Sequence, residues 1–249
     1  MLTIVISMAG KGKRFYQAGY EMPKFEIIAH GKTLFFWSMS SLKSFINADC
    51  EFIFVTLKEN QSTNFINLQC NILGIANFKI LELNELTDGQ ATSVYLSKKL
   101  WHPTTELLIY NIDTYINPGI LSISLIPKGS QGWIPCVDVP GNHWSFAAIN
   151  EEGWLIGIEE KKRISNNCSI GLYWFNDAMD YVNAYDTFYQ SVSNLINGER
   201  YIAPLYKEMV EAKKLISISL LDKKEVFFLG TPLELDNFKA IHFSHLPKY

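Results

Sequence analysis

Hydrophobic residues in the first half of the chain form short runs, and polar segments with helical spacing separate them. Leu2 to Ser7 is rich in β-branched residues and alternates little, which is the pattern of a strand buried on both faces. Further strands are predicted over Glu51 to Leu57, Phe78 to Leu83 and Leu107 to Ile112. Regular alternation of strands with helices predicts βαβ units and a parallel sheet.

The segments between these strands carry helical patterns. Apolar and small side chains recur at helical spacing from Thr33 to Phe45, and Thr33 is placed to cap the helix. Helices are also predicted from Glu59 to about Cys70 and from Gln90 to Leu100. No helix start is evident in the glycine-containing loop that follows the first strand.

The pattern changes after Pro118. Strands are predicted over Gly132 to Val139, Trp144 to Ile149, Trp154 to Glu159 and Ser169 to Phe175, with turn-forming residues between them. Closely spaced strands of this kind predict a mixed or antiparallel sheet in the second half of the chain.

The chain then returns to helices. Helices are predicted from Asp177 to about Leu195 and from Ala203 to Ala212, followed by strands over Leu215 to Leu220 and Glu225 to Leu229 and a last helix from about Pro232. The sequence contains no internal repeat and no Pro/Ser-rich linker, so residues 1–249 are predicted to form a single domain.

The composition indicates an ordered protein and argues against nucleic acid and membranes as partners. The 249 residues are 48% hydrophobic and 19% charged, which is enough to bury a sizeable core. The formal net charge of -3 provides no electrostatic footprint for nucleic acid, so we expect no nucleic-acid partner. Met1 to Met8 is too short for a signal peptide and no apolar run is long enough to cross a bilayer, so we expect a cytoplasmic protein without a membrane partner.

The cysteines carry no predicted chemistry. Cys50, Cys70, Cys136 and Cys168 stand far apart without a Cys-x-x-Cys pair. We interpret them as reduced and mostly buried thiols, because zinc sites and disulfide frameworks have closer or recurring spacings.

The segment Ser7-Met8-Ala9-Gly10-Lys11-Gly12-Lys13-Arg14-Phe15 is the most informative motif, because a strand ends there in a basic, glycine-containing loop. Glycines let backbone N–H groups approach a polyphosphate, while Lys and Arg neutralise its charge. The loop is neither a P-loop nor a Rossmann fingerprint, since the required glycine spacing is absent. A Gly-x-Gly sequence alone is also compatible with a plain surface turn.

The whole stretch resembles the first motif of the sugar-phosphate nucleotidyltransferases, also called nucleoside-diphosphate-sugar pyrophosphorylases. That motif is a loop of the form A-G-x-G-[ST]-R-[FLM] followed by a Pro-Lys pair. The resemblance implies an α/β fold with a doubly wound, Rossmann-like mixed central sheet flanked by helices, the GT-A-like nucleotidyltransferase fold. The matching residues are Ala9, Gly10, Gly12, Arg14, Phe15, Pro23 and Lys24.

A second match lies where this family binds the nucleoside. Leu86 to Ser93 resembles its segment of small residues at the head of a helix. The resemblance implies that Gly89 and Gln90 contact the nucleobase edge or the ribose. A simple helix start with Asp88 as the cap is an equally good interpretation of the same residues.

A third match is Asp113, which follows the apolar run Leu107 to Ile112. Ligands bind at the carboxyl ends of strands in open α/β sheets, and a carboxylate there suits a Mg²⁺ ion that bridges triphosphate oxygens. The matching Asp of the family is the metal ligand, so the resemblance implies that Asp113 binds Mg²⁺. A turn-stabilising role for Asp113 is the alternative.

Two further matches, at Glu160-Lys161 and around Gly171, imply binding of the second substrate. Lys161 would pair with its phosphate, Glu160 would accept hydrogen bonds from hydroxyls, and the backbone at Gly171 would permit close approach. On composition alone, the charged residues from Glu159 to Arg163 are also compatible with a solvated turn.

The family's closing Gly-Thr-Pro segment is similar to Gly230-Thr231-Pro232, but the chain departs from the family pattern just before it. Many relatives place a second metal-binding Asp two residues before the glycine, where this chain has Phe228. Asp222 is the nearest upstream carboxylate, so the number of protein ligands to the metal stays open.

The order of these matches along residues 1 to about 240 implies a nucleotidyltransferase that converts an NTP and a sugar 1-phosphate into a nucleoside-diphosphate sugar and pyrophosphate. Residues 1–116 would form the nucleotide-binding half and residues 117–249 the acceptor half. Two segments resemble the sequences of a subgroup associated with surface-polysaccharide synthesis, Trp144-Ser145-Phe146 and residues 199–204. The family's pattern makes Arg14, Lys24 and Asp113 the catalytic residues.

Other functions remain open from the sequence. A CTP-dependent cytidylyltransferase acting on a non-sugar phosphate is one alternative, because nothing in Asp88 to Ser93 identifies the nucleobase. A nucleotide-sugar-dependent glycosyltransferase would normally show Asp-x-Asp, where this chain has Asn111-Ile112-Asp113. A catalytically silent relative that only binds nucleotide is the third alternative. The sequence does not identify the nucleobase, the acceptor or the oligomeric state.

Overall fold

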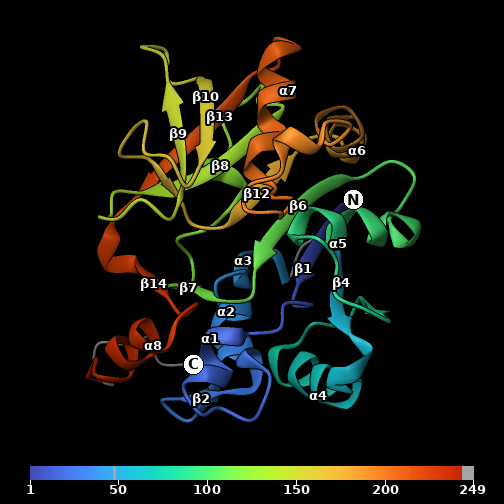
Figure 1. Cartoon of the computed structure of the whole chain (residues 1–249), viewed down its shortest axis with the longest axis vertical. Helices are drawn as coiled ribbons and strands as arrows, with labels where there is room; N and C mark the ends of the chain where they lie inside the picture. The colour runs from blue at the N-terminus through green and yellow to red at the C-terminus, as the bar shows by residue number, and fades with distance from the viewer. Residues whose placement is uncertain (47–48, 243–249) are drawn as a thin grey trace.

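The computed structural model describes residues 1–46 and 49–242. Within these residues, one large sheet passes through both halves of the chain (Figure 1). Two small two-stranded sheets accompany it, β2 (Ile28–Ala29) with β3 (Lys32–Thr33) and β7 (Thr114–Ile116) with β14 (Val226–Phe228). The strands of the large sheet are β1 (Leu2–Ser7), β4 (Cys50–Leu57), β5 (Phe78–Leu83), β6 (Glu106–Asn111), β8 (Gly132–Val137), β9 (Ser145–Ile149), β10 (Leu155–Glu160), β11 (Cys168–Ser169), β12 (Leu172–Phe175) and β13 (Ile216–Leu221).

Strand β1 lies inside the parallel part of the sheet, between β4 and β6, and β5 follows β4. The chain leaves β1 for β4 and β5 on one side and then returns to β6 on the other side. In open α/β sheets, a crevice forms outside the carboxyl ends of the strands at such a reversal of strand order. The loops that follow Ser7 and Asn111 therefore meet at one edge of the sheet.

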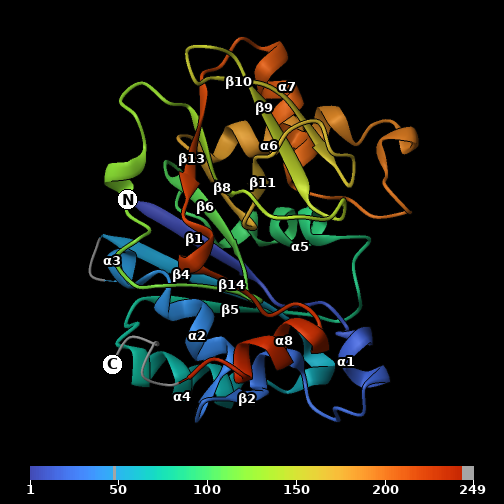
Figure 2. The same ribbon diagram turned by 90° about the vertical axis from the view of Figure 1, so that its left-hand side faces the viewer.

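Helices cover both faces of this parallel part (Figure 2). Ile4 and Ile6 point to the face covered by helices α2 and α4, whereas Val5 and Ile109 point to the face covered by α5 and α6. The doubly wound α/β fold predicted from the sequence is confirmed. The helices are α1 (Lys13–Gln17), α2 (Leu34–Ser40), α3 (Lys43–Ile46), α4 (Thr63–Leu73), α5 (Gln90–Leu96), α6 (Ala178–Phe188), α7 (Tyr206–Glu211) and α8 (Pro232–Lys239).

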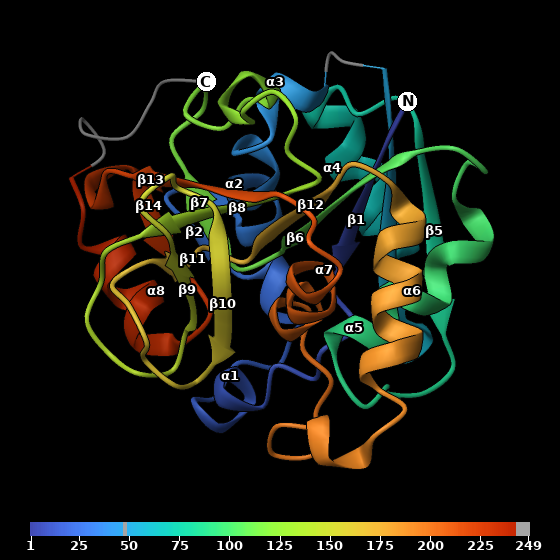
Figure 3. The same cartoon turned by 90° about the horizontal axis from the view of Figure 1, so that it is seen from above.

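The second half of the chain extends the sheet in mixed orientation. Strand β12 runs antiparallel to both β6 and β8, and β13 runs parallel to β8. Strands β9 and β10 form an antiparallel hairpin at the end of the sheet, beside α7 (Figure 3). The predicted mixed sheet is therefore confirmed.

The end of the described chain returns to the N-terminal half. Strand β14 pairs with β7, immediately after Asp113, and α8 packs beside α2 and β2 (Figures 1 and 2). Trp37, Tyr115 and Phe238 share a buried cluster there. Thr231 caps α8, because its hydroxyl accepts a hydrogen bond from the backbone N–H of Glu234.

Some helix boundaries differ from those predicted. Helix α1 begins directly after Gly12, whose φ of 59° allows the sharp entry, so the expectation of no helix there was wrong. Helix α6 ends at Phe188 instead of about Leu195, because the side-chain amide of Asn194 folds back and donates to the Phe188 carbonyl at 2.6 Å. Thr33 caps α2 as predicted, although the helix breaks before α3.

Short 3₁₀ helices link several of these elements, and the first of them carries Lys24. The 3₁₀ helices are η1 (Lys24–Glu26), η2 (Lys58–Asn60), η3 (Ser97–Leu100), η4 (Ile123–Leu125), η5 (Val192–Asn194), η6 (Ala203–Leu205) and η7 (Lys223–Glu225).

The four cysteines are buried thiols, as predicted, and burial raises the pKa of Cys70 to about 12. None of the helices in the described part of the chain has the length and apolar character needed to cross a membrane.

Substituting a strand residue should reveal how much the parallel core contributes to stability. Ile109→Ala on β6, whose side chain is 0% exposed, should lower the free energy of unfolding by about 2–5 kcal/mol because it leaves a cavity. Ile156→Ala on β10 is the matched control, since that side chain is 58% exposed and its loss should cost less than about 0.5 kcal/mol. Urea unfolding measures both values, and equal losses would contradict the described core.

Candidate functional site

Two adjoining cavities lie at the edge of the sheet where β1 and β6 end. The first has a volume of about 370 Å³ and lies between the loop from Met8 to Lys11 and the segment from Leu86 to Ser93. The second has a volume of about 510 Å³ and extends towards β9, β10 and β12. The side chains common to both cavities are Lys13, Lys24, Gln90, Asn111, Asp113, Glu199 and Tyr201.

The glycine loop is divided between the two cavities. Ala9 and Gly10 line the first cavity, whereas Gly12 and Arg14 line the second. Lys13 belongs to both. The loop that was predicted to bind phosphates therefore lies at the boundary of the two cavities, and its cationic side chains are exposed.

Lys24 and Asp113 form an ion pair at this boundary, with 2.7 Å between Nζ and Oδ2. The two side chains are 20% and 24% exposed, so they contact solvent from partly buried positions. Lys24 arrives from η1 and Asp113 from the turn between β6 and β7. The pair that the resemblance singled out is thus brought together from positions 89 residues apart.

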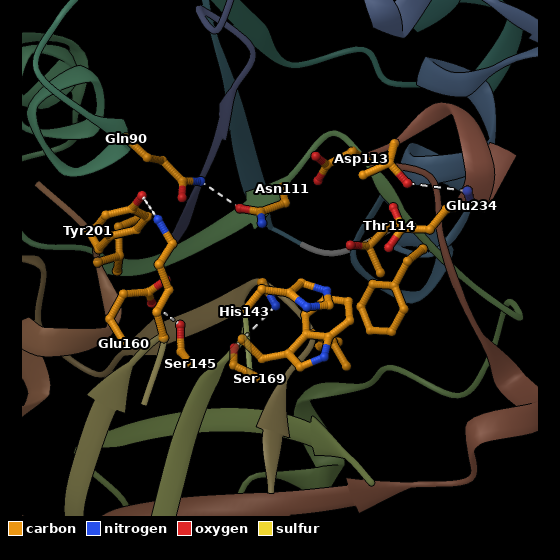
Figure 4. Close-up of a pocket in the computed structure, with 18 of the residues that line it drawn as sticks. Gln90, Asn111, Asp113, Thr114, His143, Ser145, Glu160, Ser169, Tyr201 and Glu234 are labelled. Carbon is orange, nitrogen blue, oxygen red and sulfur yellow. Dashed lines mark hydrogen bonds between the residues drawn. The ribbon is translucent and has the colours of Figure 1, made fainter. Parts of the chain in front are cut away.

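A second carboxylate faces Asp113 (Figure 4). A Cβ atom on Gly230 would lie 3.0 Å from Oδ2 of Asp113 and 3.5 Å from Oε2 of Glu234. Both oxygens therefore converge on the same point above the Gly230 backbone. Glu234 belongs to the first turn of α8, and its carboxylate makes no hydrogen bond or ion pair with any other residue in the described ranges.

Many relatives have a metal-binding Asp at the position of Phe228, and Asp222 does not supply the missing carboxylate in this structure. Its side chain is exposed, caps η7 by accepting from the Lys224 N–H, and lines neither cavity. Phe228 lines the second cavity and packs against Trp144 in a tilted arrangement, with 4.2 Å between the ring centroids. Within the described residues, no group of three or more His, Cys, Asp or Glu side chains is arranged to hold a metal ion.

Gln90 and Asn111 join the two sides of the first cavity by a hydrogen bond of 2.6 Å from Nε2 to Oδ1. Gly171 packs directly against Asn111: its φ is +81°, and a Cβ would lie 2.3 Å from the Asn111 amide nitrogen. We expected the glycine at position 171 to permit close approach of a ligand. The group that approaches it closely in this structure is the side chain of Asn111. Gly171 nevertheless lines the second cavity.

Gly89 lines the first cavity and begins α5 without a side-chain cap. Its φ is +144°, and a Cβ would lie 2.3 Å from the carbonyl oxygen of Arg200, so only glycine fits. Asp88 is not the helix cap: its carboxylate accepts from Thr92 and forms an ion pair with Arg200 at 3.2 Å.

Glu160 and Lys161 lie at the end of β10 and line the second cavity. Glu160 is buried and accepts a hydrogen bond from Ser145, which excludes a solvated turn at this residue. Burial raises the pKa of Glu160, although the Ser145 hydrogen bond and the charge of Lys161 oppose the rise. Lys161 is exposed at the cavity rim, with a φ of 57° that non-glycine residues rarely adopt.

Several residues that line the cavities were not predicted as site residues. Glu199 and Tyr201 line both cavities, and Glu234 lines the second. A local signal existed for the first two, because Asn197-Gly198 is a dipeptide typical of a two-residue hairpin turn. For Glu234 the only signal was its place three residues after the capping Thr231.

Comparison with known proteins finds a match along most of the chain. The chain aligns over 96% of its length with the whole of the nucleoside-diphosphate-sugar pyrophosphorylase from Vibrio cholerae RC9, with a TM-score of 0.87 and 34% sequence identity. The chain belongs to the nucleoside-diphosphate-sugar pyrophosphorylase family. It is a nucleotidyltransferase, and the resemblance drawn from its motifs is confirmed.

More distant structures share the fold of this nucleotidyltransferase. The inositol-1-phosphate CTP transferase from T. maritima matches 96% of the chain and 97% of its own length, with a TM-score of 0.75 and 16% identity. A putative glucose-1-phosphate thymidylyltransferase from Bacillus anthracis, in complex with a sucrose, matches 98% of the chain and 97% of its own length, with a TM-score of 0.78 and 15% identity. No protein-family model and no curated protein matches the sequence.

The buried Glu160 should make stability depend on pH. Because its folded-state pKa lies above the ordinary value of 4.5, its contribution to stability is complete below pH 4.5 and is lost as the pH rises through the folded-state pKa. The free energy of unfolding of the wild type, minus that of Glu160→Gln, should therefore fall as the pH rises above 4.5. Urea unfolding of both proteins across this range tests it, and a flat difference would contradict the effect of burial.

Proposed function

We propose that this nucleotidyltransferase converts an NTP and a sugar 1-phosphate into a nucleoside-diphosphate sugar and pyrophosphate. The observation that supports it most directly is the junction of two cavities at Lys24 and Asp113. Two substrates that are joined through a new phosphorus–oxygen bond must meet at one point. Charged side chains suited to bind phosphates are concentrated at the junction of the two cavities. Family membership supports the same reaction class.

The first cavity would hold the NTP. Backbone amides near Ala9 and Gly10 would contact its phosphates, and Gly89 and Gln90 would contact the base or ribose. Gln90 is held by Asn111, which fixes the amide that a nucleobase would meet.

The second cavity would hold the sugar 1-phosphate. Glu160 would accept hydrogen bonds from hydroxyls and Lys161 would bind the phosphate. Gly12 and Arg14 line the same cavity, on the side of the glycine loop, so Arg14 would neutralise charge where the phosphates of the two substrates meet. Residues 1–116 would thus supply most of the nucleotide site and residues 117–249 most of the acceptor site.

The reaction needs no protein nucleophile. A phosphate oxygen of the acceptor attacks the α-phosphorus of the NTP, forming the new P–O bond as the bond to the β-phosphate oxygen breaks and pyrophosphate leaves in line. A phosphate monoester is already ionised at neutral pH, so the protein has to supply position and charge neutralisation. Lys24 would stabilise the charge that develops at the α-phosphorus.

The donor set at the junction fits Mg²⁺. Asp113 and Glu234 direct carboxylate oxygens to the same point above Gly230, and Mg²⁺ in nucleotide sites is usually held by one or two carboxylates together with substrate phosphates. Bound there, the ion would neutralise triphosphate charge. Glu234 would then supply the carboxylate that Phe228 cannot.

The other functions are less well supported. A nucleotide-sugar-dependent glycosyltransferase would normally carry an Asp-x-Asp sequence, but position 111 is Asn111, whose side-chain oxygen accepts a hydrogen bond from Gln90. A CTP-dependent enzyme acting on a non-sugar phosphate is supported only weakly by the T. maritima structure, because 16% identity reflects the fold alone. A role in surface-polysaccharide synthesis and a cytoplasmic location remain predictions from the sequence.

Pyrophosphate release tests the proposal. The wild type would be incubated with Mg²⁺, each of ATP, GTP, CTP, UTP and dTTP, and a panel of sugar 1-phosphates and other small phosphorylated metabolites. Release with a sugar 1-phosphate is the expected outcome and would identify both substrates. Release only with a non-sugar phosphate would replace the proposed acceptor class. Transfer of the sugar from an added nucleotide sugar to an acceptor, with release of the nucleotide, would favour the glycosyltransferase.

Removing either member of the ion pair should nearly abolish turnover. Asp113→Ala and Lys24→Ala should each lower kcat by about 10²- to 10³-fold, because each group stabilises charge that develops in the transition state. Asp222→Ala is the matched control, since its carboxylate lines neither cavity, and it should keep near-normal activity. Circular dichroism would check that the variants fold, and near-normal rates in both active-site variants would refute this assignment.

A further inference from the structure

Lys161 does not stand alone at the rim of the second cavity. Its ammonium group donates a hydrogen bond to the hydroxyl of Tyr201, and that hydroxyl donates in turn to the carboxylate of Glu199. The ammonium also lies 4.4 Å from the centre of the Tyr201 ring. Three side chains from two distant segments therefore form one chain of hydrogen bonds.

The neutral hydroxyl in the middle of this chain has a chemical consequence. Tyr201 separates Lys161 from Glu199, and these two charged groups form no ion pair with each other. A lysine ammonium has three donors, and Tyr201 engages one of them in this chain. Lys161 is thus held in place while its charge and its other donors stay available to an anion.

Burial, and then the hydrogen bond to Glu199 and the charge of that carboxylate, raise the pKa of Tyr201 above the ordinary value of a tyrosine, which already lies well above neutrality. The hydroxyl therefore remains protonated over the physiological range. It keeps its donor for Glu199 and its acceptor for Lys161, and the direction of the hydrogen-bond chain does not reverse.

Tyr201 is itself fixed by the neighbouring backbone. Its carbonyl accepts from the hydroxyl of Tyr189 at 2.6 Å. The preceding residue, Arg200, donates its N–H to the Asp88 carbonyl at 2.8 Å and accepts from the Ala91 N–H at 3.1 Å. The segment 199–201 is therefore attached to the start of α5, which carries Gly89 and Gln90 of the first cavity.

The tight turn before this segment sets the position of Glu199. Ile196 and Glu199 exchange two backbone hydrogen bonds of 3.0 and 3.1 Å around Asn197 and Gly198. Both turn residues have positive φ, 53° and 77°, as a two-residue hairpin of this kind requires. The turn directs the chain between the two cavities, which both include Glu199 and Tyr201.

We propose that Tyr201, supported by Glu199, is the residue that positions Lys161 for the phosphate of the acceptor, and that this position is set from the nucleotide side through Arg200. This inference rests on the proposed function, because it takes the second cavity as the acceptor site. Tyr201 acts through Lys161 and is a positioning residue, not a catalytic one. The strained φ of Lys161 is consistent with a side chain held for a function.

Steady-state kinetics with the active substrate pair tests the proposal. Tyr201→Phe keeps the ring and removes the hydroxyl, so the KM for the acceptor should rise about 10-fold or more while the KM for the NTP stays unchanged. Tyr20→Phe is the matched control, because its hydroxyl accepts from Lys239 at 3.3 Å and Tyr20 lines neither cavity, so neither KM should change.

A double-mutant cycle separates positioning from a general structural effect. In the Lys161→Ala background, Tyr201→Phe should raise the acceptor KM by less than about 2-fold, because its target is gone. An undiminished effect of Tyr201→Phe in that background, or an increase in the KM for the NTP instead of the acceptor, would overturn the proposal. Circular dichroism would verify that each variant folds.

Calorimetric titration with inorganic phosphate distinguishes failure of the proposed reaction from failure of the positioning role of Tyr201. The component of phosphate binding that Lys161→Ala removes should also weaken in Tyr201→Phe and persist in Tyr20→Phe. If the wild type releases no pyrophosphate with any pair but this pattern holds, the proposed reaction fails and the positioning role stands. If turnover is normal in the wild type and Tyr201→Phe behaves like the control in both experiments, only the positioning role fails.

Discussion

The pairing of β1 with a parallel strand on each side is the constraint on which the rest of the structure depends. A strand enclosed in this way has both backbone edges engaged and both faces covered, and Ile4, Val5 and Ile6 are all 0% exposed. Polar chemistry is possible only where such a strand ends. The reversal of strand order around β1 then brings Lys24 and Asp113 to the same edge.

Distant segments complete this edge by close contact, and at three of these contacts the residue is a glycine. At these places the missing side chain makes room for another segment of the chain, not for solvent. The site is therefore built from joints between segments as much as from individual functional side chains. The three contacts are Gly89 with the Arg200 backbone, Gly171 with Asn111, and Gly230 with Asp113.

Patterns confined to one element were reliable guides to the fold. Runs of β-branched residues located the strands of the parallel sheet, and Asp113 could be recognised because it directly follows one of them. Errors arose where a neighbouring segment determines the outcome. Helix α6 stops early because Asn194 folds back onto Phe188, and no periodicity encodes that contact.

The candidate site shows the same division. The glycine loop and the Pro-Lys pair could be recognised from local order, but Tyr201 contacts Lys161 across 40 residues and Glu234 meets Asp113 only after the chain has crossed the sheet. Contacts of this kind depend on tertiary structure, and one sequence contains no pattern that reports them. The chemical roles of all these residues remain predictions.

The return of α8 to the N-terminal half has a consequence for how the protein matures. Ribosomes deliver the chain from its N-terminus, so Lys24 and Asp113 emerge long before Gly230 and Glu234. The parallel sheet can assemble while the protein is still being made, but the edge that faces the substrates closes only when residues 226–239 have left the exit tunnel. A nascent chain that has formed its nucleotide-side strands would therefore remain chemically incomplete, and activity would not begin before residues 226–239 have emerged.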